Sequence, residues 1–232
     1  MRSINQKYEA VIFDLGGTLI YGPTWADYTA AAREMAKVLS APTEDFLKLW
    51  FEQSGGLGTG ILDYQTLNKQ VCEQLGIDIN EDDINEAAVI PCNVTKRRVM
   101  IPREGAIELL TYLKSNDYKI GLISDCASDL PIIWKDTPFA PLIDVTVFSC
   151  SAGMNKADPR IFRMALKELD VNPENCLYIA DGIRQELANA SKLGMQAIRI
   201  YVPDEIEDNP LREEWDGPVI TSLHEVLNQL GE

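Results

Sequence analysis

Short apolar runs alternate with segments of helical apolar spacing along the second half of the chain. Runs typical of buried strands lie at about 118–124, 145–149, 176–180, 196–201 and 218–220. Segments in which apolar residues recur every three or four positions lie at about 104–116, 128–135, 158–170, 185–194 and 222–230. Strands that alternate with helices of this length predict an α/β fold, with a parallel sheet covered by helices on both faces.

The first part of the chain has one strand and then a long helical block. A buried strand is predicted at about 8–13, and helical spacing follows at about 24–40, 43–54, 63–76 and 80–99. We expect the last helix to break or bend at Pro91, residues 54–60 to be a loop, and Gly76 to end its helix. The block separates the first strand from the others. The sequence therefore predicts a core domain of residues 1–20 and 101–232. An inserted helical domain, residues 21–100, is expected to cover the carboxyl edge of the sheet, where ligands bind in such folds.

Composition and charge narrow the range of partners. The chain has 232 residues, of which 46% are hydrophobic and 25% are charged, as in ordinary globular proteins. Its formal net charge of −15 repels the phosphate backbone of nucleic acids, so we expect no nucleic-acid partner. A small phosphorylated ligand stays compatible with this charge, because a bound cation reverses the local sign.

Cysteine and histidine usage argues against a metal centre of thiolates and imidazoles. No C-x-x-C pair occurs, the one histidine is His224, and the cysteines are Cys72, Cys92, Cys126, Cys150 and Cys176. These thiols favour a reducing, cytoplasmic setting, and Cys126, close to Ser124, is expected to be inert rather than oxidation-sensitive. No segment has the pattern of a signal sequence or a membrane span, so we expect no membrane partner. The oligomeric state does not follow from these patterns.

Polar side chains follow four of the predicted strands, at the point where each strand ends. The first of these points is VIFDLGGTLI, at residues 11–20, where an aspartate and two glycines follow the apolar run. The carboxyl ends of parallel strands share one edge of a sheet, so we expect all four points to converge. In chain order the residues are Asp14, Ser124 with Asp125, Lys156, and Asp181 with Glu186.

This set of side chains suits phosphoryl transfer through an aspartyl-phosphate. A carboxylate can be the nucleophile. Mg²⁺ takes oxygen atoms from one or two carboxylates and from phosphate, while a hydroxyl and a lysine stabilise the remaining phosphate oxygens. Each residue alone also has an ordinary structural explanation: a strand-end aspartate often caps a turn, and Glu186 suits the first turn of a helix. The pattern is informative because four strand ends agree.

The four motifs resemble those of the haloacid dehalogenase superfamily, over about residues 8–202. The matching segments, in the family's order, are FDLGGTL, GLISD, NKADPRIF and YIADGIRQELANASKLGM. The resemblance implies a Rossmann-like core with a helical cap inserted between the first two motifs. It also implies that Asp14 is the catalytic nucleophile and that Ser124 and Lys156 bind the phosphoryl group, with Lys156 assisting catalysis.

The same resemblance implies a Mg²⁺ cofactor. Its ligands would be Asp14, the backbone carbonyl of Gly16, and Asp181. Glu186 would orient Lys156 or metal-bound water.

Three positions depart from the family pattern. Ala157 and Ala180 replace a usual proline and glycine, which are mild changes. Gly16 replaces the aspartate that acts as general acid and base in phosphatase members. Such catalysis is worth about 10²–10⁴-fold, so we expect a slow hydrolase of a small phosphorylated metabolite, biased towards good leaving groups. Asp125 is another acid near the site, but the sequence does not determine where its side chain points.

Three other functions share parts of this pattern. Actin-like sugar kinases have a similar D-x-G-G-T loop, but theirs joins two strands of a hairpin, and Ser124, Lys156 and Asp181 stay unexplained. A 2-haloacid dehalogenase also lacks the second aspartate, and its first aspartate attacks a carbon atom of the substrate. Such an enzyme needs no metal ion, whereas Asp181 and Glu186 favour a metal site. The third alternative is a non-catalytic protein of the same fold that binds phosphate or a partner protein.

Overall fold

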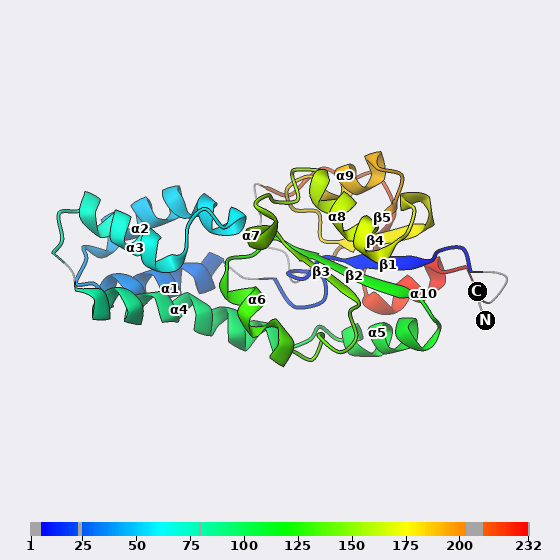
Figure 1. Cartoon of the computed structure of the whole chain (residues 1–232), viewed down its shortest axis with the longest axis horizontal. Coiled ribbons are helices and arrows are strands. Elements are labelled where there is room, and N and C mark those ends of the chain that lie inside the picture. The colour runs from blue at the N-terminus through cyan, green and yellow to red at the C-terminus, as the bar shows by residue number, and fades with distance from the viewer. Residues whose placement is uncertain (1–5, 23–24, 79, 203–210, 232) are drawn as a thin grey trace.

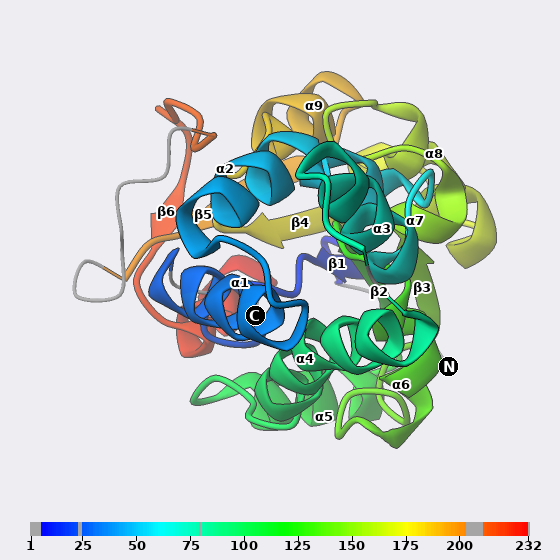
Figure 2. The same cartoon turned by 90° about the vertical axis from the view of Figure 1, so that its left-hand side faces the viewer.

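The sheet is parallel throughout. The computed structural model describes residues 6–22, 25–78, 80–202 and 211–231. Within these ranges the strands pair in the order β3-β2-β1-β4-β5-β6 (Figures 1 and 2). Their bounds are Ala10–Phe13 (β1), Lys119–Ser124 (β2), Val145–Phe148 (β3), Cys176–Ala180 (β4), Gln196–Ile200 (β5) and Val219–Ile220 (β6). The predicted parallel α/β fold is therefore confirmed.

Helices cover both faces of this sheet. Their bounds are Ala106–Ser115 (α5), Asp129–Ile133 (α6), Ser149–Ala152 (α7), Arg160–Leu169 (α8), Glu186–Lys192 (α9) and Val226–Gln229 (α10). Short 3-10 helices lie at Trp134–Asp136, Pro173–Asn175 and Leu223–Glu225. None of the helices within the described ranges is both long and apolar enough to cross a membrane.

The strands of the sheet place alternate side chains in two apolar layers. Val11 and Phe13 of β1 belong to the layer that also contains α5 and α10. Ala10 and Ile12 belong to the layer that contains α8 and α9. Figure 1 shows these two pairs of helices on opposite sides of the strands. A continuous apolar run such as AVIF therefore forms a strand buried on both faces.

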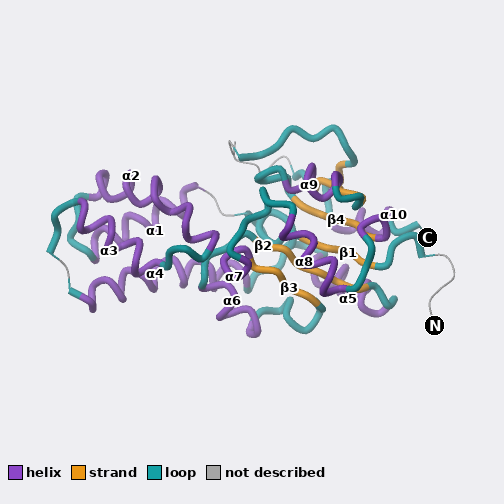
Figure 3. Tube along the Cα trace, turned by 45° about the horizontal axis from the view of Figure 1, so that its top comes forward, coloured by secondary structure: helices purple, strands orange, loops and turns teal. Residues whose placement is uncertain are grey.

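The remaining helices form a separate lobe with its own apolar core, called the helical lobe below. Met35, Phe46, Leu67 and Ile84 are fully buried against one another in this core. Figure 3 shows the lobe at one end of the molecule, and Figure 2 shows it in front of the sheet. The helices are α1 (Trp25–Val38), α2 (Thr43–Gln53), the 3-10 helix η1 (Ser54–Thr59), α3 (Tyr64–Gln74) and α4 (Glu81–Val99).

One prediction for the helical lobe, the loop at 54–60, is wrong, and the predicted break at Pro91 is absent, while a bend there stays a prediction. α4 continues through Pro91, although proline removes the N–H that would bond to the carbonyl of Ala87. Pro91 is buried, and α4 packs against α1 and α3, so packing outweighs the lost hydrogen bond. Residues 54–60 are not a loop, because η1 occupies most of them and Gly60 ends it with φ +69°. Gly76 ends α3 as predicted, with φ +67°.

The helical lobe covers the carboxyl edge of the sheet. Its two connections lie side by side, because Ile20 and Pro102 form an antiparallel bridge and the N–H of Arg103 donates to the carbonyl of Leu19 at 2.8 Å. The Arg98 guanidinium adds a 2.6 Å hydrogen bond to the carbonyl of Tyr21. α6, which follows β2, contacts α4, and α7, which follows β3, contacts η1. The ends of the strands therefore face the lobe, as Figure 1 shows.

Candidate active site

Four of the predicted site residues meet at the carboxyl edge of the sheet. β1 pairs directly with β4, so Asp14, immediately after β1, lies beside Asp181, immediately after β4. Carboxylate oxygens of Asp14, Asp181 and Glu186 lie within 4.8 Å of one another. The ammonium group of Lys156 contacts Asp14 and Glu186. All four residues are buried, with 9% exposure or less over the whole residue.

Asp14 is held by hydrogen bonds on both of its carboxylate oxygens. Its Oδ1 accepts from the ammonium of Lys156, and its Oδ2 accepts from the hydroxyl of Thr18 at 3.2 Å. Burial raises the pKa of Asp14 to about 7, even though the Lys156 charge lowers it, and the nearby Glu186 charge raises it further. The negative charge of Asp14 is thus only partly compensated by the protein.

Glu186 anchors Lys156 and the loop after β4. Its Oε2 lies 2.5 Å from the Lys156 ammonium and accepts from the hydroxyl of Tyr178 at 2.8 Å. Its Oε1 accepts from the backbone N–H groups of Gly182 and Ile183, at 3.0 and 2.9 Å. A carboxylate has about four acceptor positions, and protein donors occupy four here. Glu186 therefore positions its neighbours and has no oxygen left over for a metal ion.

Asp181 is the least satisfied carboxylate of the group. Its Oδ1 is buried and has no hydrogen-bond partner among the described residues, and its Oδ2 is 3.7 Å from a guanidinium nitrogen of Arg212. Burial, followed by the charges of Glu186 and Asp14, raises its pKa well above the ordinary value. Gly17 makes this packing possible: its φ is +82°, and a Cβ atom there would lie 2.5 Å from Asp181 Oδ2.

The donor set fits a hard divalent cation. Asp14 and Asp181 present neighbouring carboxylates, and the buried Oδ1 of Asp181 has no hydrogen-bond partner within the part of the chain that the structure describes. Mg²⁺ binds such oxygen ligands, and its charge would offset the buried negative charge. The bridge between Gly16 and Ile20 uses the carbonyls of Leu15 and Ile20, so it does not consume the carbonyl of Gly16.

Ser124 lies at the same edge of the sheet, on the strand next to β1. It is the last residue of β2, it is buried, and Leu122 of the same strand is in register with Phe13. Within the described residues its hydroxyl forms no hydrogen bond to Asp14 or Lys156. Ser124 is therefore placed beside the cluster without being joined to it.

Asp125 lies against the lysine segment. Its Oδ1 accepts from the backbone N–H of Lys156 at 3.0 Å, and its Oδ2 lies 3.7 Å from the guanidinium of Arg184. Burial raises the pKa of Asp125. Asn189 supports the same segment, because its amide donates to the Lys156 carbonyl at 3.0 Å. These contacts make Asp125 part of the support of Lys156.

Sequence reasoning missed Arg103, which holds the loop after Asp14. Its guanidinium donates to the carbonyls of Thr18 and Gly17 at 2.9 and 3.0 Å and stacks over the Tyr21 ring at 4.9 Å. The only local signal is its position directly after the predicted domain boundary. Its partners are 85 and 86 positions away in the chain, and no periodicity connects them.

The second missed element is a strap, Leu211–Glu213, across the loop that follows Asp181. The N–H of Arg184 donates to the carbonyl of Leu211, and the N–H of Glu213 donates to the carbonyl of Gly182, both at 2.9 Å. The Glu213 carboxylate also accepts from the N–H groups at the start of α9. The strap thereby holds Arg212 near Asp181. No motif in the sequence indicates that this segment crosses the loop.

Comparison with known proteins identifies the family. The sequence profile described as haloacid dehalogenase-like hydrolase matches residues 8–194. This match covers most of the chain, so the chain belongs to the haloacid dehalogenase-like hydrolases, as its motifs predict.

Two curated relatives match parts of the chain. The Rhythmically expressed gene 2 protein of Drosophila melanogaster is 29% identical over 107 residues, which are 43% of this chain and 41% of that protein. The glyceraldehyde 3-phosphate phosphatase of Pyrococcus furiosus is 29% identical over 148 residues, which are 62% of this chain and 60% of that protein. The chain therefore spans about half the length of these relatives.

Solved structures share the fold along nearly the whole chain. A 2-haloacid dehalogenase from Pseudomonas syringae has a TM-score of 0.69 at 19% identity and covers 95% of this chain and 97% of its own. A haloacid dehalogenase-type phosphatase from Thermococcus onnurineus has a TM-score of 0.66 at 18% identity and covers 96% and 98%. A family enzyme from Bacteroides thetaiotaomicron, in complex with magnesium and inorganic phosphate, has a TM-score of 0.58 at 16% identity and covers 90% and 98%. At these identities the likeness concerns the fold.

Proposed function

We propose that this protein is a Mg²⁺-dependent phosphatase that hydrolyses a small phosphorylated metabolite through a phosphoaspartate on Asp14. The observation that carries the proposal is the buried pair of Asp14 and Lys156 beside Asp181, whose Oδ1 has no partner among the described residues. This arrangement combines a carboxylate nucleophile, a fixed cation and a cation-binding oxygen. The name of the Pyrococcus furiosus relative, a glyceraldehyde 3-phosphate phosphatase, supports a small phosphorylated substrate.

Each residue of the cluster has a separate role in this proposal. An oxygen of Asp14 attacks phosphorus in line with the leaving oxygen. Lys156 contacts Asp14 and is positioned to bind a phosphate oxygen at the same time. Ser124, at the end of the neighbouring strand, donates to another phosphate oxygen. Glu186 keeps the Lys156 ammonium in place.

The Mg²⁺ ion belongs to the proposal as a cofactor. Asp14, Asp181 and the backbone carbonyl of Gly16 would hold it. When bound, the ion supplies positive charge that neutralises the phosphate oxygens. The buried negative charge of Asp14 and Asp181 supports this assignment, as does the magnesium and phosphate complex of the Bacteroides thetaiotaomicron enzyme.

Gly16 sets the expected substrate preference. Position 16 has no side chain to protonate the leaving oxygen or to activate the water that cleaves the phosphoaspartate. General acid–base help is worth about 10²–10⁴-fold, so turnover is slow unless the leaving group has a low pKa. Acyl and aryl phosphates should therefore react faster than alkyl phosphates.

We also propose that residues 21–100 act as a cap on a core of residues 1–20 and 101–232. The separate apolar core of the helical lobe and its adjacent connections at Ile20 and Pro102 support this division. The contacts of α6 with α4 and of α7 with η1 support a position of this cap over the strand ends. Closure of such a lobe over bound substrate excludes water from the reaction.

A panel of alkyl, aryl and acyl phosphates, assayed with Mg²⁺ and with excess chelator, tests the proposed function. We expect phosphate release that needs Mg²⁺ and is lost in Asp14→Asn. The exposed Asp45→Asn in α2 is the matched control and should keep wild-type rates. Undiminished phosphate release from Asp14→Asn would exclude the mechanism.

Gly16 also favours a second candidate, a 2-haloacid dehalogenase, since those enzymes lack the second aspartate as well. In that reaction the Asp14 oxygen attacks carbon, and water then cleaves the resulting ester at the carboxyl carbon. One turnover in heavy-oxygen water therefore labels Asp14, whereas the phosphatase route labels the released phosphate. Halide release from a 2-haloacid without Mg²⁺, with label on Asp14, would select this candidate.

A further inference from the structure

Two thiols lie close together at the carboxyl ends of the neighbouring strands β2 and β3, just after Ser124 and Asp125 in the case of Cys126. Cys126 follows Asp125, and Cys150 lies in α7, which follows the neighbouring strand β3. Their sulfur atoms are 3.8 Å apart. The two segments are also joined by Ser149, whose hydroxyl accepts from the N–H of Cys126 at 2.9 Å. The pairing is therefore part of the packing of two adjacent strand ends.

The two thiols differ in their chemistry. The hydrogen bond shared by the two sulfur atoms lowers the pKa of Cys150 to about 7, and the contact with Ser151 lowers it further, while burial opposes both. The same hydrogen bond, together with burial, raises the pKa of Cys126. A thiolate is the nucleophile in thiol–disulfide exchange, and it reacts best when its pKa is near the ambient pH. Cys150, whose sulfur also lies 3.9 Å from the hydroxyl of the exposed Ser151, thus has the character of an attacking thiol, and Cys126 that of a resolving thiol.

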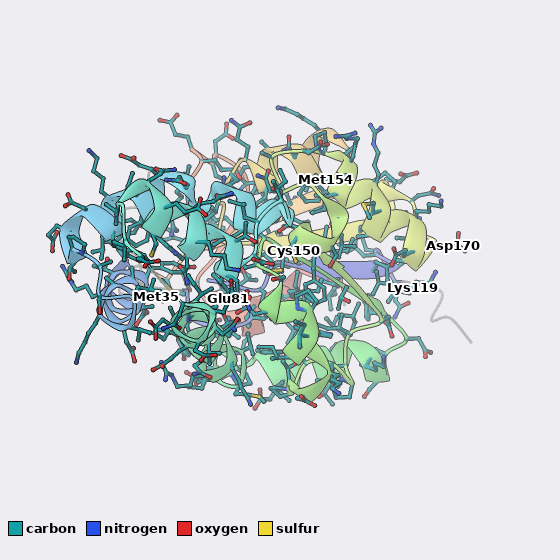
Figure 4. All side chains as sticks on the ribbon, turned by 60° about the vertical axis from the view of Figure 1, so that its left-hand side comes forward. Met35, Glu81, Lys119, Cys150, Met154 and Asp170 are labelled. Atoms are coloured by element: carbon teal, nitrogen blue, oxygen red, sulfur yellow. The ribbon has the colours of Figure 1, made fainter. Side chains whose placement is uncertain are left out.

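The pair also lies where the helical lobe meets the sheet. A Cβ atom on Gly60, which ends η1, would lie 2.1 Å from the carbonyl oxygen of Cys150, so the two backbones are in direct contact. Ala127, next to Cys126, packs against the apolar core of the lobe. Figure 4 shows Cys150 at this junction. On its other side Cys126 adjoins Asp125, which accepts from the N–H of Lys156.

We propose that Cys126 and Cys150 form a redox modification site, which low-molecular-weight disulfides convert to an intramolecular disulfide. The Cys150 thiolate attacks one sulfur of the small disulfide, forms a mixed disulfide and releases one thiolate. Cys126 loses its proton and attacks the Cys150 sulfur, which forms the Cys126–Cys150 bond and releases the second small thiol. The protein loses two electrons and two protons, and one small disulfide becomes two thiols.

The disulfide changes the geometry of the site. A disulfide bond is about 2.0 Å long, so the sulfur atoms must approach from 3.8 Å. This closure pulls on the segment that contains Ser124 and Asp125, and hence on the support of Lys156. A misplacement of about 1 Å can cost about 10²-fold in rate, so we expect the oxidised protein to turn over about 10²-fold more slowly. This consequence for turnover rests on the proposed function, but the disulfide itself does not.

The test oxidises the full-length native protein with oxidised glutathione, alkylates the remaining thiols and maps the peptides by mass spectrometry. We expect one peptide pair linked through Cys126 and Cys150, with the other three cysteines alkylated after unfolding. Dithiothreitol should reverse the link and restore activity. Cys126→Ser should stop at a glutathione adduct on Cys150, and Cys150→Ser should resist both the link and the loss of rate. Cys92→Ser, which changes a thiol outside the pair, should behave as wild type.

Two results would overturn this inference. One is the absence of the linked peptide pair after full equilibration with oxidised glutathione. The other is a quantitative disulfide that leaves turnover unchanged in a protein whose reduced form is active. If the reduced protein hydrolyses no phosphate ester, the proposed function fails, and the peptide map still decides whether the redox site exists.

Discussion

The carboxylate of Glu186 lies 2.5 Å from the ammonium of Lys156, and both groups are buried. Asp14 contacts the same ammonium group, so one lysine joins two carboxylates that come from different strand ends. The remaining acceptor positions of Glu186 are filled by Tyr178 and by the backbone of the loop after β4. Glu186 therefore fixes the distance between the lysine segment and the Asp181 loop.

Replacement of Glu186 by glutamine tests this anchoring. The amide keeps one oxygen for the N–H groups of Gly182 and Ile183, but its NH₂ group faces the Lys156 ammonium and the Tyr178 hydroxyl. Removal of one partner of a buried ion pair costs about 3–5 kcal/mol, so we expect a loss of this size in the free energy of unfolding. Tyr178→Phe removes a single hydrogen bond and should cost about 1 kcal/mol. Equal losses in the two variants, measured by urea denaturation, would contradict the anchoring role.

The stability of the metal-free protein should depend on pH through Asp14. Its pKa is about 7 in the folded protein, against an ordinary value of 3.8. Between these values the unfolded chain has released a proton that the folded protein retains, so the free energy of unfolding falls as pH rises from about 4 to about 7. Denaturation at pH 5 and pH 7 in excess chelator measures this slope, and Asp14→Asn should reduce it. An unchanged slope in that variant would assign the pH dependence to other groups.

The stabilisation of the protein by Mg²⁺ should increase as pH rises, which is opposite to the pH dependence of the metal-free protein. Its carboxylate ligands must be ionised, so binding competes with protons. We therefore expect Mg²⁺ to raise the melting temperature more at pH 8 than at pH 6. Asp181→Asn should weaken the response at both pH values, since it removes the charge from a carboxylate whose Oδ1 has no hydrogen-bond partner among the described residues. Equal Mg²⁺ responses of wild type and Asp181→Asn would argue against a metal site at Asp181.

The neighbouring glycines 16 and 17 should respond oppositely to substitution. Gly16 is not among the glycines with positive φ, so its backbone accepts an aspartate. Gly16→Asp would supply the missing acid and base, and we expect a gain of about 10²-fold or more on alkyl phosphates, with a smaller gain on aryl phosphates. Gly17→Ala is the control and should inactivate the enzyme, because its Cβ would meet Asp181 Oδ2 at 2.5 Å. A uniform gain on all substrates would contradict the assignment of Gly16 as the missing proton donor.

Arg103 should influence turnover without touching substrate. Its guanidinium bridges the carbonyls of Gly17 and Thr18, which a lysine ammonium cannot reproduce with the same fork geometry. Loosening of this loop moves Asp14, so we expect Arg103→Lys to lower kcat/KM by about tenfold or more, with the circular dichroism spectrum unchanged. Arg33→Lys, at an exposed position of α1, is the matched control. Wild-type kcat/KM in Arg103→Lys would show that the loop holds its shape without the bridge.

Much of the fold and part of the site follow from local patterns in the sequence. Apolar runs such as AVIF predict strands because both faces of a parallel sheet are buried. Once the sheet is parallel, Asp14 and Asp181 must share an edge, and the structure places them immediately after two adjacent strands, β1 and β4. The helical character of Ser54–Thr59 was not predictable from its glycine-rich composition, since its 3-10 turn depends on packing between the lobe and α7.

The rest of the site depends on contacts between distant segments. Arg103 reaches a loop 85 positions earlier, and Arg212 reaches Asp181 through a strap that pairs with the loop after β4. Tyr178 is an apolar position of β4 by pattern, and only the fold directs its hydroxyl to Glu186. Neither hydrophobic spacing nor turn signals contain this information, so these residues appear only with the three-dimensional structure.

The central claim is that Asp14 carries the phosphoryl group during turnover, and an acid quench tests it most directly. The wild-type protein is mixed with Mg²⁺ and an aryl phosphate, quenched in acid during the steady state, digested and examined by mass spectrometry. The account predicts one added phosphoryl group on the peptide that contains Asp14, and none in Asp14→Asn. Because Gly16 slows hydrolysis of the intermediate, a large fraction of the enzyme should carry the group. Steady turnover with an unmodified Asp14 peptide, or a phosphoryl group on another residue, would contradict the account.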